Sequence, residues 1–366
     1  MFFNSAQNCQ IDLQILDKLS DKEVITWVSF SSNELRSAIE KCSNTSTSGL
    51  DKLSWKHLKK IIRDDTCFRK FVDIVNVCID LEHWLVYFKV PTTIIILKPN
   101  KESYNSPKTF WSIILLNTIG KLFKKAISER LQFVLVLNNF IHTCQLRSLK
   151  QRSTTNMGIV LTHFICMGWV KNISTSMLAF DIVQFFPLLN YQLLLWILNK
   201  EGFDFKVLLF FQNYLVGRRT KYLWNSFFSP FFDVNIGVGQ GSALSSILSF
   251  LYLAPIFHIF EKRIKNLKIL ISIFLFVDDG LFISQNKSLV ALNTNIFCSY
   301  NVISSLLGKF RLTMEHGKTE VFYFSRLQRT FNSPLLDLTP LGGHILYPKT
   351  TWWYLRFIFN QKLLFH

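Results

Sequence analysis

Two aspartates stand side by side in a stretch that is otherwise apolar. The segment ISIFLFVDDGLFISQ (271–285) places Asp278 and Asp279 between two runs of the kind that form strands. Adjacent carboxylates repel each other unless a cation neutralises them. A divalent metal ion supplies that charge, and Mg²⁺ prefers oxygen ligands. The segment therefore predicts a β-hairpin that holds Asp278, Asp279 and Gly280 between its strands, with two metal-binding acids at the turn.

A third acid ends another apolar run. MLAFD (177–181) is typical of a short buried strand, and it closes on Asp181. If the two strands are neighbours, three carboxylates converge, which is the arrangement of a two-metal site for phosphoryl or nucleotidyl transfer. A plainer interpretation stays open, because aspartate pairs also occur in turns for conformational reasons alone.

The overall composition favours a polyanionic partner. Lys and Arg number 41 against 24 Asp and Glu, so the formal charge is +17. Nucleic acid is the first candidate and an anionic membrane surface the second. Apolar residues make up 49% of the chain, but runs such as ILISIFLFV (269–277) fall short of the ~20 residues of a spanning helix. The start, MFFNSAQNCQIDLQ, lacks the pattern of a signal peptide, and the seven cysteines form no CxxC pair. We therefore expect an intracellular protein with no membrane partner and no zinc site.

Local patterns predict the elements that position the acids. Ser32 is the expected N-cap of a helix over 31–42. Asn190 caps a helix that Gly202 closes. The remaining segments predict helices over 53–65 and 115–135, a strand within 90–101, a helix end followed by a basic turn in 211–224, and a Gly-rich turn that opens a helix in 237–246.

Several of these segments together resemble a known family. FVDD (276–279) resembles the [FY]xDD signature of reverse transcriptases. LAFDIVQFF (178–186) resembles their first palm motif, and GVGQGSALS (237–245) resembles their xQGS motif.

Upstream blocks resemble one branch of that family. The segment 97–131, which begins LKPNKESYNSPKTFW, is similar to the fingers of LINE-type, non-LTR retrotransposon enzymes, and 48–60 and 145–155 fit further blocks of the same group. The order holds from about residue 31 to the end, and the likeness is greatest to elements of fungal genomes.

The resemblance implies an α+β fold of the right-hand polymerase type. Its antiparallel palm sheet would carry the acids, and the thumb would be largely missing. The implied division is a lead-in over 1–30, fingers and the fingers/palm junction over 31–175, palm over 176–330, and a primer-grip region with the truncated start of a thumb over 331–366.

The implied activity is RNA-directed DNA polymerisation. A DNA primer would be extended with dNTPs on an RNA template, and action on target DNA would place the protein in the nucleus. The resemblance implies that Asp181 and Asp278 hold two Mg²⁺ ions, for which Mn²⁺ can substitute, with Asp279 as a supporting acid. The main-chain carbonyl of Ile182 is a further implied ligand.

Other residues receive roles through the same resemblance. Phe186 would exclude a ribose 2′-hydroxyl, although core packing with Phe180 and Phe185 is the alternative. Lys318 is a candidate general acid, with an exposed lysine as the alternative. The implied nucleotide contacts are Lys98, Trp111, Phe186, Gln240 and Gly241. The implied phosphate contacts, each of which could instead be a solvated surface charge, are Lys150, Arg152, Arg218, Arg219 and the cluster Lys121, Lys124 and Lys125.

The chain also departs from the family pattern. Trp111 stands where the family carries an Arg that clamps the triphosphate, and Trp supplies neither that charge nor its fork of donors. Ser112, Leu50 and Ser246 each replace a Pro, and Arg356 replaces a Gly. Each change can arise by one C-to-T or G-to-A step, which suggests a decaying element copy.

Competing hypotheses follow from these departures. The chain is either an active polymerase or a catalytically decayed nucleic-acid-binding remnant. A two-metal nuclease would have no use for the xQGS turn, and an RNA polymerase would have no use for a bulky Phe186.

Overall fold

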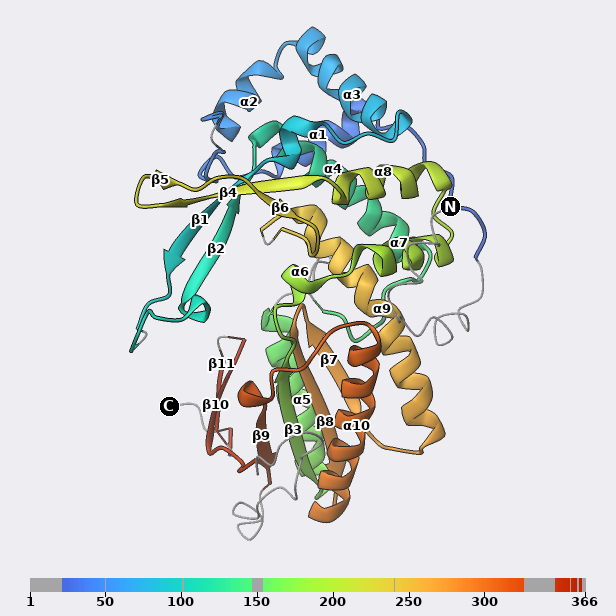
Figure 1. The fold of residues 1–366 in the computed structure, drawn as a ribbon. Coiled ribbons are helices and arrows are strands. Elements are labelled where there is room, and N and C mark those ends of the chain that lie inside the picture. Colours follow the sequence, from blue (N-terminus) through green and yellow to red (C-terminus); the bar gives the residue numbers. More distant parts are fainter. Residues whose placement is uncertain are drawn as a thin grey trace. The chain divides into compact units, whose positions relative to one another are not determined.

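The computed structural model of the chain describes residues 22–49, 51–100, 102–146, 154–239, 241–325, 346–355, 357–360 and 362–363, apart from the side chain of Lys108. It divides into two compact units, one formed by Met1–Phe140 with Phe186–Tyr252 and the other by Ile141–Phe185 with Leu253–His366 (Figure 1). The division into lead-in, fingers, palm and thumb stays a prediction.

The first unit combines helices with a mixed sheet. Its helices are α1 (Ser32–Glu40), α2 (Trp55–Ile61), α3 (Asp65–Asp80), α4 (Thr118–Leu137), α7 (Tyr191–Lys200) and α8 (Phe205–Leu215), with 3-10 turns η3 (Val86–Lys89) and η4 (Pro107–Thr109). Its strands are β1 (Thr92–Leu97), β2 (Phe110–Leu115), β4 (Arg218–Trp224), β5 (Phe227–Phe228) and β6 (Phe232–Val234). The short α6 (Phe185–Leu188) and the long α9 (Ala243–Asn266) belong partly to each unit.

Helix caps agree with the sequence except at one position. The cap of α1 is Ser31 rather than the predicted Ser32: its hydroxyl accepts from the Glu34 N–H, and the Glu34 carboxylate accepts from the Ser31 N–H. A capping box satisfies two N-terminal donors at once, which favours Ser31 over its neighbour. Asn190 caps α7 as expected, and Gly202 follows it at φ +81°.

The sheet of the first unit runs in the order β2-β1-β4-β5, with β6 paired to β4. β1 pairs antiparallel with β2 and parallel with β4. The expected basic turn in 211–224 is wrong, because Arg218–Trp224 is a strand whose N–H and C=O groups pair with three neighbours. β2 was not anticipated from the sequence.

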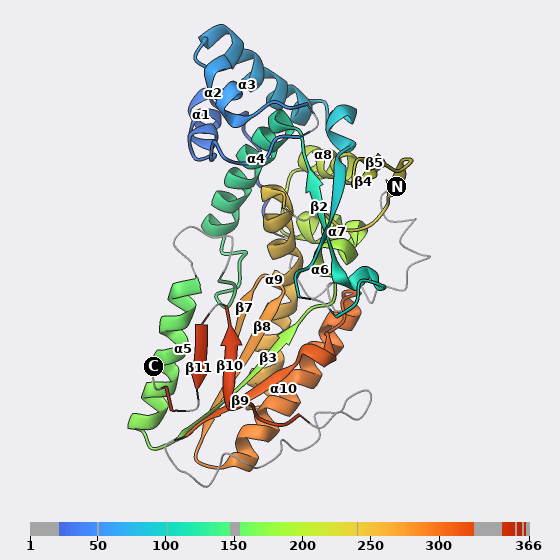
Figure 2. The ribbon, with the colours of Figure 1, turned by 90° about the vertical axis from the view of Figure 1, so that its left-hand side faces the viewer.

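The second unit carries the antiparallel sheet that the resemblance implied. Its elements are α5 (Thr154–Val170), β3 (Ser174–Asp181), β7 (Ser272–Phe276), β8 (Asp279–Asn286), α10 (Leu289–Lys309), η5 (His316–Lys318), β9 (Glu320–Phe324), β10 (Thr351–Tyr354) and β11 (Phe357–Asn360). The strand order is β7-β8-β3-β9, every pairing is antiparallel, and β10 and β11 form a separate ribbon (Figure 2).

Both faces of this sheet are buried, which explains its nearly continuous apolar strands. One face packs Met177, Leu281 and Ile283 against α5 and the β10–β11 ribbon. On the other face the ring of Phe282 lies 5.1 Å from that of Phe180 and 5.7 Å from that of Phe260 on α9. A sheet held from both sides is a stiff support for whatever its strand ends carry.

Helix α9 is longer than any apolar run considered in the sequence. In the described part of the chain it is the one helix whose length and composition would allow it to cross a membrane. Most of it, 78% of its most apolar window, is buried inside the molecule, as in the core helix of a soluble protein. Its hydrophobicity is therefore accounted for by packing.

Candidate active site

The turn between β7 and β8 is tighter than the sequence suggested. Phe276 pairs with Asp279, so only Val277 and Asp278 form the turn, and the prediction that Asp279 and Gly280 lie in it is wrong. Val277 has φ +68°, a conformation that costs a β-branched residue free energy. A two-residue hairpin turn with a positive φ at its first position matches the twist of the two strands. Pairing of the strands therefore imposes the positive φ on Val277. Strained positions of this kind gather at functional sites.

Strand register brings two of the acids together. Asp181, the last residue of β3, is the Cα partner of Asp279, the first residue of β8. Directly opposed residues of an antiparallel pair share a face, with Cβ atoms ~5 Å apart. The Ile182 N–H donates to the carbonyl of Asp278 at 3.2 Å, which ties the third acid to the same strand end.

The carboxylate of Asp181 already has a cationic partner. Its side chain is 16% exposed and accepts a hydrogen bond from the ammonium of Lys318, which lies in η5. That bond is the main cause that raises the pKa of Lys318, and the negative charges of Asp181, Glu315 and Asp279 add to it. Lys318 therefore offsets part of the negative charge of the acids, although its side chain is 66% exposed. Both the general-acid role and the alternative of an exposed lysine stay predictions.

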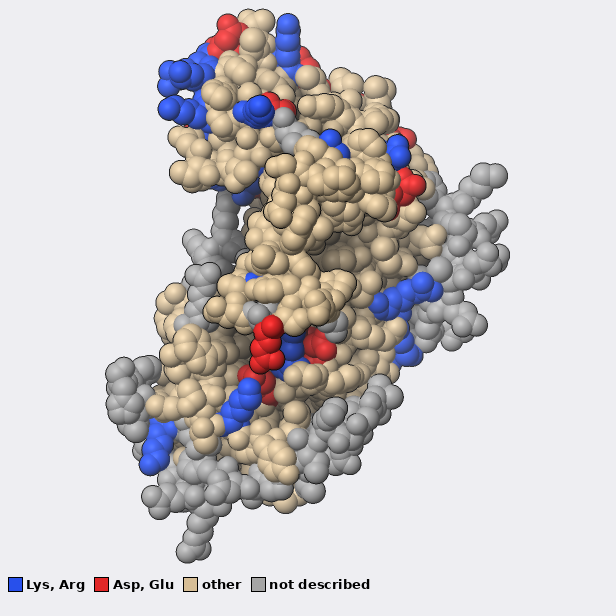
Figure 3. Space-filling view, turned by 60° about the vertical axis from the view of Figure 1, so that its left-hand side comes forward, with Lys and Arg blue, Asp and Glu red and all other residues tan. Residues whose placement is uncertain are grey.

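The three acids do not form a ready cage of ligands. Among the described residues, no group of three or more His, Cys, Asp and Glu side chains is arranged to hold a metal ion. The ligand set inferred from the sequence stays a prediction. Near the centre of the face drawn in Figure 3, acidic and basic side chains lie next to one another.

Gly280 fixes how closely the two central strands approach. A Cβ at this position would lie 2.0 Å from the ring of Phe180, its Cα partner across the strands. The ring of Phe180 is therefore packed directly over the backbone next to Asp279.

The charge of Asp279 also affects a tyrosine of the neighbouring ribbon. Burial raises the pKa of Tyr354, and the charge of Asp279 adds to that shift.

Phe186 and the glycine turn meet within the first unit. The carbonyl of Phe186 accepts from the Val238 N–H at 2.7 Å. Gly237, at φ +73°, has no room for a side chain because a Cβ would lie 2.2 Å from the carbonyl oxygen of Pro187. Phe180 and Phe185 are buried whereas Phe186 is half-buried, so core packing explains the first two rings better than the third.

Arg218 donates hydrogen bonds to the backbone on both sides of this region. Its guanidinium donates to the carbonyls of Leu215, Ile236 and Gly237. Burial lowers its pKa to about 10. Arg219 next to it is exposed and pairs with Asp233 at 3.2 Å. The phosphate contact of Arg218 stays a prediction, and its donors hold the backbone that leads to the glycines.

The lysine cluster of α4 is not a surface patch. Lys124 is buried, and burial lowers its pKa to about 7, with the charge of Arg218 adding to the shift. Its ammonium lies 5.6 Å from the ring centroid of Trp84 and 5.3 Å from that of Tyr214. Lys121 donates to the carbonyl of Thr47, and Lys125 pairs with Glu129. The predicted phosphate contact is wrong for Lys124, because a buried ammonium cannot reach a ligand in solution.

Some of the other residues singled out in the sequence are described by the structure, and some are not. Trp111 on β2 is 48% exposed, Lys98 is half-buried after β1, and Gly241 has φ +97° with open space where a Cβ would be. Gln240, Lys150 and Arg152 lie outside the described residues, as do Leu50 and Arg356.

Comparison with known families decides the broad identity. A family model described as reverse transcriptase (RNA-dependent DNA polymerase) matches residues 96–357. The chain belongs to the reverse transcriptase family. The match runs from the end of β1 to the start of β11 and thus includes all three acids. No curated protein matches the chain.

Family membership makes this chain an RNA-directed DNA polymerase domain, a class of nucleotidyltransferase that takes a nucleic-acid template and primer with nucleotide substrates. Domains of this family generally use divalent metal ions. The mixed helix-and-sheet fold is consistent with such a domain.

Proposed function

We propose that the chain extends a DNA primer on an RNA template as the reverse transcriptase of a non-LTR retrotransposon. One observation carries the proposal: the register of β3 and β8 sets Asp181 opposite Asp279 at the end of a sheet buried on both faces. A template-directed polymerase needs acids at fixed positions, because positioning and electrostatic stabilisation supply most of the rate of phosphoryl transfer. The non-LTR assignment is supported by the likeness of 48–60 and 97–131 to that branch.

The donor set fits a hard divalent cation. Asp181, Asp278 and Asp279 offer carboxylates, Ile182 offers a carbonyl, and the residues belong to adjoining ends of β3 and β8. Oxygen ligands of this kind suit Mg²⁺ and Mn²⁺. When bound, two such ions would activate the primer hydroxyl and stabilise charge on the triphosphate.

Lys318 offsets one negative charge of the three acids, that of Asp181, before any ligand arrives. Its ammonium donates to Asp181, so an entering cation has to displace it. The displaced ammonium would stay next to the acids, because η5 is followed directly by β9, which pairs with β3. We propose that Lys318 then serves as the proton donor to the departing pyrophosphate.

Phe186 is proposed to select the sugar. Its half-buried ring is tied through the Val238 bond to the glycine turn that the resemblance places at the nascent pair. A bulky ring under the sugar would clash with a ribose 2′-hydroxyl. Phe186→Ala should raise incorporation of rNTPs relative to dNTPs, while Phe227→Ala, which changes an exposed ring of β5, should leave that ratio alone. An unchanged ratio in Phe186→Ala would remove this role.

A decayed remnant is the second candidate. It is favoured by Trp111, whose exposed side chain on β2 offers no positive charge where the family carries an Arg. Such a protein would keep its affinity for nucleic acid and lose turnover.

Primer extension on poly(rA)–oligo(dT) with dTTP and Mg²⁺ tests the proposal. Asp278→Asn should lower the rate by at least about 100-fold, since metal-bound acids supply several kcal/mol of transition-state stabilisation. Asp233→Asn, which changes an exposed acid of β6 in the first unit, is the matched control and should keep the rate. Equal rates in the two variants would contradict the assignment of the acids.

A further inference from the structure

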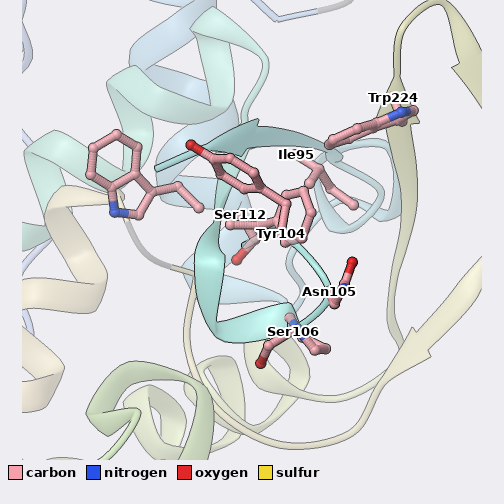
Figure 4. A pocket seen from close by; sticks show the side chains of 9 residues that line it. Ile95, Tyr104, Asn105, Ser106, Ser112 and Trp224 are labelled. Atoms are coloured by element: carbon pink, nitrogen blue, oxygen red, sulfur yellow. The ribbon is translucent and has the colours of Figure 1, made fainter. Parts of the chain in front are cut away.

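A cavity of about 650 Å³ opens on the β1–β2 hairpin of the first unit. Four aromatic side chains border it, namely Tyr104, Phe110, Trp111 and Trp224, together with the polar Asn105 and Ser112 (Figure 4). Its volume lies in the usual range of small-molecule sites. Asp181, Asp278 and Asp279 are not among the described residues that line this cavity, so the roles proposed for them do not account for it.

The rings around the cavity are held in place without a ligand. The hydroxyl of Tyr104 donates to the carbonyl of Lys98 at 2.7 Å, which orients the tyrosine over the hairpin. The ring of Phe110 meets that of Tyr104 edge-on with centroids 6.0 Å apart, and meets that of Trp224 edge-on at 5.4 Å. A site ordered in advance loses little entropy when a ligand binds.

The chemistry of the lining selects an uncharged planar group. The described residues that line the cavity are all uncharged, and a phosphate buried against them would lose water without gaining a cation from them. Aromatic faces stack well on nucleobases of every kind. The amide of Asn105 and the hydroxyl of Ser112 offer donors and acceptors for the edge of a base.

Cations for the adjoining phosphates lie on the strand that reaches the cavity. Trp224 ends β4, and Arg219 and Lys221 lie earlier on the same strand. The Lys221 ammonium lies 4.4 Å from the ring centroid of Phe228 on β5, and the Arg219 guanidinium lies 5.2 Å from that of Phe231. Proteins usually bind a single strand with its bases stacked on aromatic rings and its phosphate backbone next to basic residues.

We propose that the cavity holds one unpaired nucleobase of a single-stranded nucleic acid. The inference deepens the proposed function by naming a base-binding site on the hairpin. It is tested by binding alone, so its failure is distinguishable from a failure of polymerisation.

The experiment titrates the protein into a short single-stranded oligonucleotide that carries one 2-aminopurine, whose fluorescence falls when the base stacks. Tyr104→Ala and Trp224→Ala should weaken the quenched complex by roughly 5- to 100-fold, the range for loss of one base–aromatic stack. Tyr104→Phe keeps the ring and loses only the bond to Lys98, so it should retain most of the quenching. Tyr87→Ala removes an exposed tyrosine of η3 that does not line the cavity, and it should bind as the unchanged protein does.

Two further ligands, an abasic strand and a free nucleotide, complete the design. An abasic oligonucleotide of equal length and charge should compete poorly for the quenched complex. Equal competition by the abasic strand, or quenching that survives both Tyr104→Ala and Trp224→Ala, would overturn the proposal. A 2-aminopurine deoxynucleoside triphosphate that is quenched more strongly than the strand, and in a Tyr104-dependent way, would overturn the assignment to a strand and give the cavity to the free nucleotide.

Discussion

The two units of the molecule use their aromatic side chains in opposite ways. In the second unit Trp352 is buried and stacks between Phe322 and Tyr354, with ring centroids 4.5 and 4.6 Å away. In the first unit Trp111 is 48% exposed at the border of an open cavity. The first arrangement fixes the strands that end in acids, whereas the second leaves rings available for a ligand. Substitutions of these rings should therefore lower stability in the second unit and lower ligand binding in the first.

The largest stability effect should come from Trp352. Trp352→Ala removes a fully buried ring from the core of the second unit and should lower the free energy of unfolding by about 3–5 kcal/mol. Trp353→Ala, one residue further along β10, removes a ring that is 70% exposed and should cost less than ~0.5 kcal/mol. Denaturant unfolding of both variants measures the difference. Equal losses would contradict the assignment of Trp352 to the packed core of the second unit.

A glycine pair sharpens the same comparison within the second unit. Gly280→Ala places a methyl group 2.0 Å from the ring of Phe180 and should destabilise by about 1–3 kcal/mol through overpacking. It should also slow primer extension, because the strand that carries Asp279 must shift. Gly308→Ala meets open space near the end of α10 and should stabilise by up to ~1 kcal/mol. Thermal unfolding of the two variants should therefore move in opposite directions, and a Gly280→Ala protein as stable as the parent would contradict the close approach.

In the first unit, the buried Lys124 should make the free energy of unfolding depend on pH. Its pKa of about 7 in the folded state, set by burial, lies below the ~10.4 of an ordinary lysine. Between these values the unfolded chain binds more protons than the folded one, so the free energy of unfolding rises with pH by up to ~1.4 kcal/mol per pH unit. Lys124→Met should remove this rise, while Lys125→Met should keep it. Unfolding curves at pH 7 to 10 check this, and identical slopes in Lys124→Met and the unchanged protein would show that Lys124 does not titrate there.

Sequence patterns predicted the strands next to the acids, because apolar runs flank Asp278 and Asp279 and another apolar run ends on Asp181. They misplaced the turn by expecting Asp279 and Gly280 in it. The Asp-Asp-Gly run favours a turn by local preference, but the pairing of Phe276 with Asp279 places the positive φ on Val277 instead. Here the sheet overrides local preference, which a single sequence does not reveal.

Charge patterns were less informative than apolar ones. Lys124 and Arg218 were both expected to meet phosphates, yet one is buried among rings and the other holds backbone carbonyls. Whether a basic side chain points outward depends on its tertiary neighbours. The aromatic cavity was missed for the same reason, because Tyr104, Phe110 and Trp224 come together only through pairing of β1 with β2 and β4.

The most direct test compares four proteins in primer extension on poly(rA)–oligo(dT): the unchanged chain, Asp278→Ala, Trp111→Arg with Ser112→Pro, and that double variant with Asp278→Ala. The central claim is that the acids of the second unit form a polymerase site, whatever has changed on the hairpin of the first. It predicts extension by the double variant, weaker or no extension by the unchanged chain, and none by either protein that carries Asp278→Ala. Extension that persists in both Asp278→Ala proteins, or no extension by the double variant when it is folded and binds the primer–template, would contradict it.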